Sequence, residues 1–198
     1  MDLNDFICVF DNAYTKQECK KIIDRCENSE FLRSGMCSGP NGAEYNNTKK
    51  TLEVPVKYSV NLGDIEDLVY SKLKSPCSKY IDLIYEKFGN YQLFSDNLSD
   101  TGYMFKKYVQ NDSWFGWHSD DTILTKNTRR VLAIIVYLND VDEGGCTEFK
   151  FGRKVSPKEG SVLIFPTGAL FTHRGQKPIS GVKYCLTSFI EGECNSYL

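Results

Sequence analysis

The stretch RRVLAIIVYLNDVDEGGCTEFKF, from Arg129 to Phe151, places an apolar run, a turn signal and a second apolar run one after another. Gly144 and Gly145 stand in the turn, where a side chain would obstruct the backbone. Similar short runs, apolar or alternating, continue from Tyr91 onward and are separated by segments rich in Gly, Pro, Asp and Ser. Strands at this spacing predict an antiparallel double-sheet barrel of the jelly-roll type.

Helical patterns precede these strands. Thr15 and Glu18 form a capping box ahead of apolar residues at helical spacing, which predicts a helix from about Lys16 to Glu27. A second helical region spans roughly residues 65–88, and we expect an interruption at Ser75 and Pro76, where a new helix can begin.

No internal repeat, low-complexity tract or linker divides the chain. We therefore expect a single domain of class α+β, a double-stranded β-helix (jelly-roll) barrel supported by N-terminal helices. Residues 1–90 would form the helical support and a substrate-side loop, the latter at residues 34–50, which are rich in Gly and Asn. Residues 91–198 would form the jelly-roll core.

The composition, with 41% hydrophobic and 25% charged residues, is ordinary for a globular protein. A net charge of -2 without long blocks of like charge argues against nucleic-acid binding. We recognise neither a signal peptide nor an apolar run long enough for a membrane span, so we expect a cytoplasmic protein. The eight cysteines include no Cys-x-x-Cys pair, which disfavours a zinc ribbon and favours reduced thiols.

The stretch FGWHSDDT, from Phe115 to Thr122, contains one of only two histidines in the chain. On a strand, residues i and i+2 share a face, so His118 and Asp120 would point the same way. Together with His173 they would form a set of two imidazoles and one carboxylate, which is typical of non-haem Fe(II) oxygenases. A His-x-Asp pair also occurs often by chance, and a lone strand histidine is more often a surface or core residue.

Four stretches around these histidines resemble the 2-oxoglutarate and Fe(II)-dependent dioxygenases, in particular the prolyl 4-hydroxylase-like group. They are YVQNDSWFGWHSDD, RRVLAIIVYLNDVDEGGCTEF, VSPKEGSVLIFP and THRGQKPISGVKYCLTSFI. The resemblance covers most of residues 105–191. It implies that His118, Asp120 and His173 hold Fe(II), and that Lys183 pairs with the distal carboxylate of 2-oxoglutarate.

The strand pattern around Lys183 agrees with that implication. In GVKYCLTSF, Lys183, Cys185 and Thr187 alternate with apolar residues and would face into the barrel, where a lysine needs an anion. The alternative is a solvated lysine at the end of a strand. The resemblance also implies that Tyr108 lines the cosubstrate pocket.

Two more residues follow from the same resemblance. Tyr137 would donate to the distal carboxylate, and Thr147 would face the pocket. Tyr108 or Tyr137 could instead be a structural aromatic residue with a satisfied hydroxyl.

The activity implied is that of a 2-oxoglutarate-dependent dioxygenase, an oxidoreductase that uses Fe(II) and O2 and is stimulated by ascorbate. The prime substrate expected is peptidyl proline in a peptide or protein, as in procollagen-proline-type 4-dioxygenases. One alternative is a hydroxylase of a free amino acid or another small molecule. The other is a non-catalytic jelly-roll module that only binds a metal or a ligand.

Overall fold

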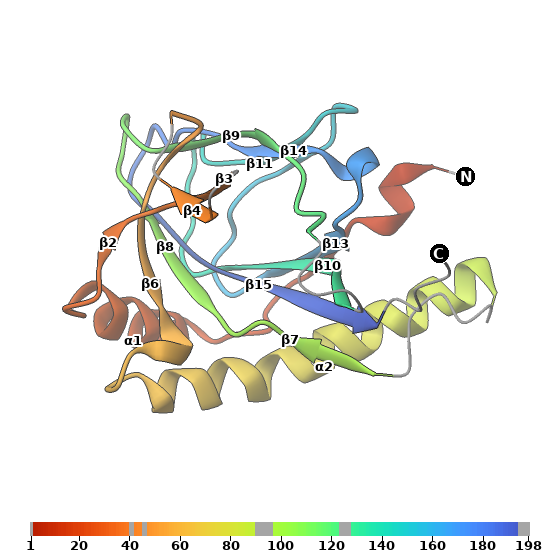
Figure 1. Cartoon of the computed structure of the whole chain (residues 1–198), viewed down its shortest axis with the longest axis horizontal. Coiled ribbons are helices and arrows are strands. Elements are labelled where there is room, and N and C mark those ends of the chain that lie inside the picture. Colours follow the sequence, from red (N-terminus) through yellow and green to blue (C-terminus); the bar gives the residue numbers. More distant parts are fainter. Residues whose placement is uncertain (1, 40–41, 45–46, 90–96, 123–127, 194–198) are drawn as a thin grey trace.

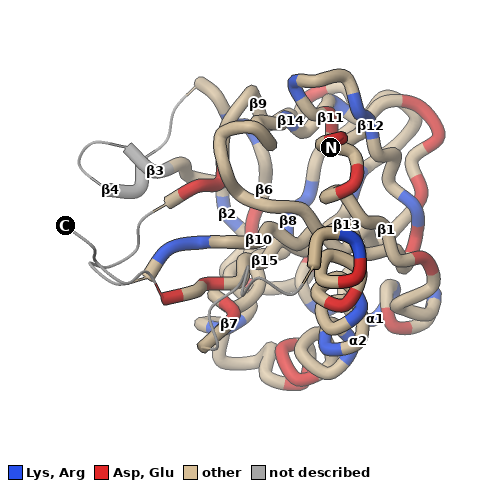
Figure 2. The backbone as a smooth tube through the Cα atoms, turned by 90° about the vertical axis from the view of Figure 1, so that its right-hand side faces the viewer, with Lys and Arg blue, Asp and Glu red and all other residues tan. Residues whose placement is uncertain are grey.

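Two antiparallel sheets and two long helices form three layers in a computed structural model of the chain, which describes residues 2–39, 42–44, 47–89, 97–122 and 128–193. The helices lie against one face of the larger sheet, and the smaller sheet lies on its other side (Figure 1). Positive and negative residues are interspersed along the chain (Figure 2).

The larger sheet has eight strands in the order β1-β13-β10-β15-β8-β6-β2, with β7 paired to β15. Its strands are β1 (Cys8–Phe10), β2 (Arg33–Ser34), β6 (Leu52–Pro55), β7 (Leu98–Asp100), β8 (Met104–Tyr108), β10 (Thr128–Tyr137), β13 (Val162–Pro166) and β15 (Lys183–Glu193). The long strands β10 and β15 pair from Thr128 and Glu193 to Tyr137 and Cys185. They form the centre of this sheet.

The smaller sheet has five short strands in the order β12-β11-β14-β9-β5. They are β5 (Lys49–Lys50), β9 (Trp114–His118), β11 (Thr147–Phe149), β12 (Lys154–Val155) and β14 (His173–Gly175). A separate hairpin joins β3 (Cys37–Gly39) and β4 (Gly42–Glu44). Residues 34–50 were expected to be a long loop, and that expectation is wrong in part, because β2 ends there and the short strands β3, β4 and β5 lie there.

The two helices are α1 (Lys16–Glu27) and α2 (Gly63–Phe88). Helix α1 has the predicted bounds, and the capping box of Thr15 and Glu18 is formed. The interruption expected at Pro76 is wrong, because α2 continues through it. Pro76 is itself buried, with Leu73 and Tyr80 buried on either side. We attribute the tolerance of this proline to that packing, since an interior proline alone costs about 3 kcal/mol.

Two apolar cores hold the layers together. The first lies between the helices and the larger sheet and includes Ile22, Ile65, Ile134 and Leu186. The second includes Tyr137 and Phe165 of the larger sheet and Phe149 of the smaller sheet, so it joins the two sheets. Within the described residues no strand pairing links the sheets, so the expected jelly-roll barrel is present as two stacked sheets and is not closed.

Candidate metal and cosubstrate site

The two histidines meet on neighbouring strands of the smaller sheet. Strand β9 ends at His118, β14 begins at His173, and the two residues are opposite each other in the antiparallel register. Asp120 follows two residues after His118, beyond the end of β9. The expectation that His118 and Asp120 share a strand face is therefore wrong in detail, because the chain has left the strand before Asp120.

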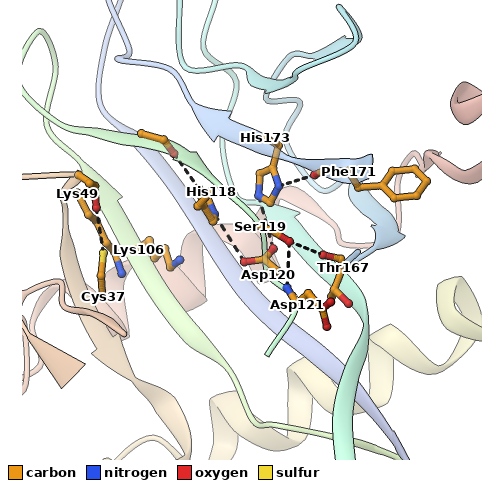
Figure 3. A network of polar contacts seen from close by, with 12 residues as sticks. Cys37, Lys49, Lys106, His118, Ser119, Asp120, Asp121, Thr167, Phe171 and His173 are labelled. Carbon is orange, nitrogen blue, oxygen red and sulfur yellow. Dashed lines mark hydrogen bonds and ion pairs between the residues drawn. The ribbon is translucent and has the colours of Figure 1, made fainter. Parts of the chain in front are cut away.

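The side chains nevertheless converge. His118 Nε2 lies 3.5 Å from Asp120 Oδ1, and His173 Nε2 lies 3.5 Å from Asp120 Oδ2. The three residues point toward one another in Figure 3. One ligand atom from each lies within 4.8 Å of the others.

Backbone carbonyls fix which ring nitrogens face Asp120. His118 Nδ1 lies 2.8 Å from the Gly116 carbonyl, and His173 Nδ1 lies 3.1 Å from that of Phe171. A carbonyl only accepts, so each Nδ1 carries the proton and each Nε2 presents a lone pair. Two lone pairs and a carboxylate facing one another are matched by a cation, and this donor set suits Fe(II).

The histidines are buried in the neutral state that a metal ligand needs. Burial, together with the neighbouring His173, lowers the pKa of His118 to about 4, while Asp120 acts in the opposite direction. Burial likewise lowers the pKa of His173. The imidazoles are therefore uncharged at neutral pH, which leaves Nε2 free to bind a metal.

Lys183 lies across a cavity from this group, on the larger sheet. The cavity, which we call the inner cavity, is lined by His118, Asp120, His173 and Lys183, together with Tyr108 and Thr147. Lys183 is only 2% exposed, and its Nζ donates to the Gly145 carbonyl at 2.7 Å. Within the described residues it has no carboxylate partner.

Burial lowers the pKa of Lys183 because the charged form is desolvated. An anion at its ammonium would offset that cost. The rings of Tyr108 and Tyr137 lie 4.8 Å and 5.4 Å from Nζ, which adds cation–π stabilisation. A carboxylate ligand such as the distal end of 2-oxoglutarate therefore suits this end of the cavity.

The alternation predicted for the Lys183 strand is confirmed. Lys183, Cys185 and Thr187 line the inner cavity, whereas Tyr184 and Leu186 pack into the core on the helix side. Alternate side chains of this strand therefore face the cavity and the core, as the period of two in a strand predicts.

Tyr108 and Lys183 are paired across β8 and β15, and Tyr108 lines the inner cavity. Thr147 lines it as well. Tyr137 is fully buried and does not line the cavity, but its hydroxyl lies 2.7 Å from Thr147 Oγ1. This hydrogen bond joins the larger sheet to the smaller one.

Gly144 and Gly145 form the turn that the sequence indicated. Both have positive φ, and a Cβ on Gly144 would lie 2.4 Å from the Lys177 carbonyl oxygen. The turn presents the Gly145 carbonyl to Lys183. A side chain at Gly144 would therefore move the acceptor that holds the lysine.

Lys106 and Gly175 also line the inner cavity, and the sequence analysis did not single them out. The signal for Lys106 was present, because it lies two residues before Tyr108 on β8 and so shares its face. A Cβ on Gly175 would lie 3.1 Å from the Tyr108 hydroxyl. Only the tertiary structure reveals that close approach.

A second cavity, which shares His118 and Asp120 with the first, is called the outer cavity. Besides the metal-binding candidates, its lining includes Lys49, Glu53, Lys106 and Arg130. Figure 3 shows Lys106 between Lys49 and His118. His118 and Asp120 thus border both cavities, whereas His173 lines the inner cavity.

Residues 103–191 match the sequence model of the 2OG-Fe(II) oxygenase superfamily. The match covers 89 of the 198 residues, so the chain is similar to this superfamily over that part. The predicted resemblance is thereby confirmed, together with the use of Fe(II), 2-oxoglutarate and O2 that the family implies. Stimulation by ascorbate stays a prediction.

Three solved prolyl hydroxylases share the fold. A viral collagen prolyl hydroxylase from Paramecium Bursaria Chlorella virus-1, solved with 2-oxoglutarate, is 15% identical with a TM-score of 0.65, over 94% of this chain and 96% of that one. A Trichoplax adhaerens prolyl hydroxylase, solved with a hypoxia inducible factor peptide fragment, is 17% identical with a TM-score of 0.70, over 95% and 84%.

A Pseudomonas putida prolyl-4-hydroxylase is 13% identical with a TM-score of 0.60, over 93% of this chain and 91% of that one. No curated protein sequence matches the chain. Among the described helices, none is long and apolar enough to cross a membrane.

Proposed function

We propose that this dioxygenase hydroxylates proline within a peptide or protein. One observation carries the proposal. The inner cavity is lined both by a group of residues that can bind a cation and by Lys183, a buried lysine that has no carboxylate partner among the described residues. The match of residues 103–191 to the superfamily model and the fold shared with three prolyl hydroxylases support it.

Each residue of the inner cavity has a role in this proposal. His118, Asp120 and His173 would hold Fe(II), and Lys183 would hold the distal carboxylate of 2-oxoglutarate. Tyr108 would border the cosubstrate, and Thr147 would orient the Tyr137 hydroxyl toward it. Once bound, Fe(II), 2-oxoglutarate and O2 supply the oxidising chemistry, which yields succinate, carbon dioxide and a hydroxylated C–H bond.

The cavity walls would exclude bulk water. Phe115 stacks on His118 with ring centroids 3.6 Å apart, and Ile135 and Phe189 line the larger-sheet side. Apolar walls strengthen the electrostatic attraction between Lys183 and an anion, and they hold the residues of the site in place.

The outer cavity would receive the prime substrate, since it reaches the same ligand group from outside. Its lining includes Met36 and Thr48 from one segment of the chain and Thr122 from another. A lining made by two separate segments favours an extended peptide. A free amino acid or another small molecule is the alternative substrate, and the complete His, Asp, His and Lys set argues against a module that only binds.

We also propose that residues 1–198 act as one jelly-roll domain. Strands β1, β2 and β6, all before residue 91, extend the larger sheet, and β5 extends the smaller one. The first ninety residues would therefore complete the sheets as well as support them.

The first experiment is anaerobic addition of Fe(II) and 2-oxoglutarate, which should give a weak visible charge-transfer band. In air, slow succinate formation should follow, with stimulation by ascorbate. Proline-containing peptides should accelerate it and gain the mass of one oxygen. If succinate forms but no such peptide gains mass, while free amino acids do, the small-molecule alternative replaces the peptidyl one.

A further inference from the structure

The outer cavity contains more positive than negative charge. Lys49, Lys106 and Arg130 line it, against the carboxylates of Glu53 and Asp120. Asp120 faces the two imidazoles and also interacts with Arg130, so Glu53 is the carboxylate nearest to the two lysines.

Glu53 is already occupied by Lys49. Its Oε1 accepts from Lys49 Nζ at 2.7 Å and from Thr51 Oγ1 at 2.9 Å. Lys49 also donates to the Met36 carbonyl at 2.9 Å. Lys49 and Glu53 therefore form a satisfied, buried pair on the wall of the cavity.

Lys106 is buried without such a partner. The residue is 8% exposed, and its Nζ lies 3.9 Å from Glu53 Oε1, which is too far for a hydrogen bond. Its Nζ also lies 5.4 Å from the centre of the Phe115 ring. Among the described residues no acceptor satisfies the three donors of this ammonium, and a buried charge in that state is costly.

Arg130 is the second cation with an unsatisfied donor. Its Nε is buried and has no hydrogen-bond partner within the described part of the chain. The guanidinium lies 3.8 Å from the centre of the Phe189 ring, which orients its plane. A planar guanidinium held in this way is suited to a carboxylate.

We propose that the outer cavity binds a carboxylate of the prime substrate on Lys106 and Arg130. The enzyme would then prefer substrates in which an acidic group lies close to the C–H bond that is hydroxylated. In a peptide, that group is a neighbouring Asp or Glu side chain; in a free amino acid, it is the molecule's own carboxylate. This inference rests on the proposed function and adds the chemical class of the substrate.

The test compares acids with matched amides. Proline peptides that carry Asp or Glu next to the proline are compared with the same peptides carrying Asn or Gln, and free proline with prolinamide. The ratio of kcat/KM between acid and amide, from product mass gain, should be about tenfold to a hundredfold, the range expected for hydrogen bonds to a charged group. The peptide pair and the free pair together identify the source of the carboxylate.

Variants assign the preference to residues. Lys106→Met and Arg130→Met should each bring the acid-to-amide ratio toward one, and Lys106→Arg should retain part of it. Lys107→Met is the matched control, because Lys107 lies on the opposite face of β8, where it pairs with Glu27. The control should keep the wild-type ratio.

Calorimetry of the same peptides with metal-free protein separates this inference from the proposed function. Tighter binding of acids with no succinate from any substrate would contradict the proposed function alone. Equal binding and equal turnover of acids and amides by the wild-type protein would overturn this inference. The inference would also be overturned if Lys106→Met raised the apparent 2-oxoglutarate constant and left the acid preference unchanged, because Lys106 would then bind the cosubstrate.

Discussion

The two walls of the inner cavity are built in different ways. The metal-binding wall consists of strands of three to five residues, β9, β11 and β14, and the lysine wall contains β10 and β15, with ten and eleven residues. The back of the lysine wall is buried against the helices through Ile134 and Leu186. The back of the metal-binding wall carries charged residues such as Glu148 and Arg174, which pair at 2.6 Å.

This difference follows from what each wall holds. A metal binds through several ligands, so short strands suffice once the metal joins them. A buried lysine without an anion raises the free energy of the folded protein, and a strand packed on both faces can carry that cost. We therefore expect changes in the metal-binding wall to affect activity, and changes behind the lysine wall to affect stability.

The largest effect should come from the metal-binding wall. His118→Ala, His173→Ala and Asp120→Ala should each abolish turnover and sharply weaken Fe(II) binding, because one of three protein ligands is lost. Succinate formation and iron binding measure the two effects. Asp121→Ala is the control, since this carboxylate pairs with Arg129 and not with the histidines. Wild-type succinate formation by the His173→Ala variant would show that the third ligand is another residue.

The second effect concerns the lysine wall. Lys183→Met removes the charge at similar length, and losing one partner of a buried charge pair costs on the order of 2 to 5 kcal/mol. The apparent 2-oxoglutarate constant should therefore rise roughly thirty- to several-thousand-fold at saturating iron. Fe(II) affinity should change little, and Lys183→Arg should rescue only in part. An unchanged constant would mean that another cation, with Arg129, Arg130 and Arg174 the first to examine, holds the cosubstrate.

The third prediction compares the loss of stability caused by substitutions behind each of the two walls. Ile134→Ala should lower the free energy of unfolding by about 2 to 5 kcal/mol, because it leaves a cavity in the core against the helices. Glu148→Ala should lower it by at most about 1 kcal/mol, because Arg174 is 41% exposed and solvent screens the pair. Urea unfolding of both variants measures the difference, and equal losses would contradict the contrast between the walls.

A smaller effect than that of Ile134→Ala should come from the hydrogen bond that joins the walls. Tyr137→Phe and Thr147→Val each leave one buried hydroxyl unpaired, at a cost of about 1 to 3 kcal/mol. The double variant should lose less than the sum of the two, because it leaves neither hydroxyl behind. If Tyr137 also donates to 2-oxoglutarate, Tyr137→Phe should raise the cosubstrate constant more than Thr147→Val does. Equal constants would make this tyrosine purely structural.

The sequence by itself determined the features that depend on local pattern. The capping box of Thr15 and Glu18 set the start of α1, and the period of two placed Lys183 and Cys185 on the cavity side of β15. The same period would have identified Lys106 from its spacing to Tyr108. These features need only neighbouring residues along the chain, so their signals are complete in the sequence.

The tertiary structure decided what distant segments do to one another. It kept α2 continuous through Pro76 by packing that helix on the sheet. It also ended β9 at His118, so that the carboxylate of Asp120 reaches the histidines from the segment beyond the strand. It also brought Arg130 and Lys106 to one cavity while Glu53 was taken by Lys49. Which buried charges find a partner depends on contacts between strands far apart in the chain, and no local pattern encodes that competition.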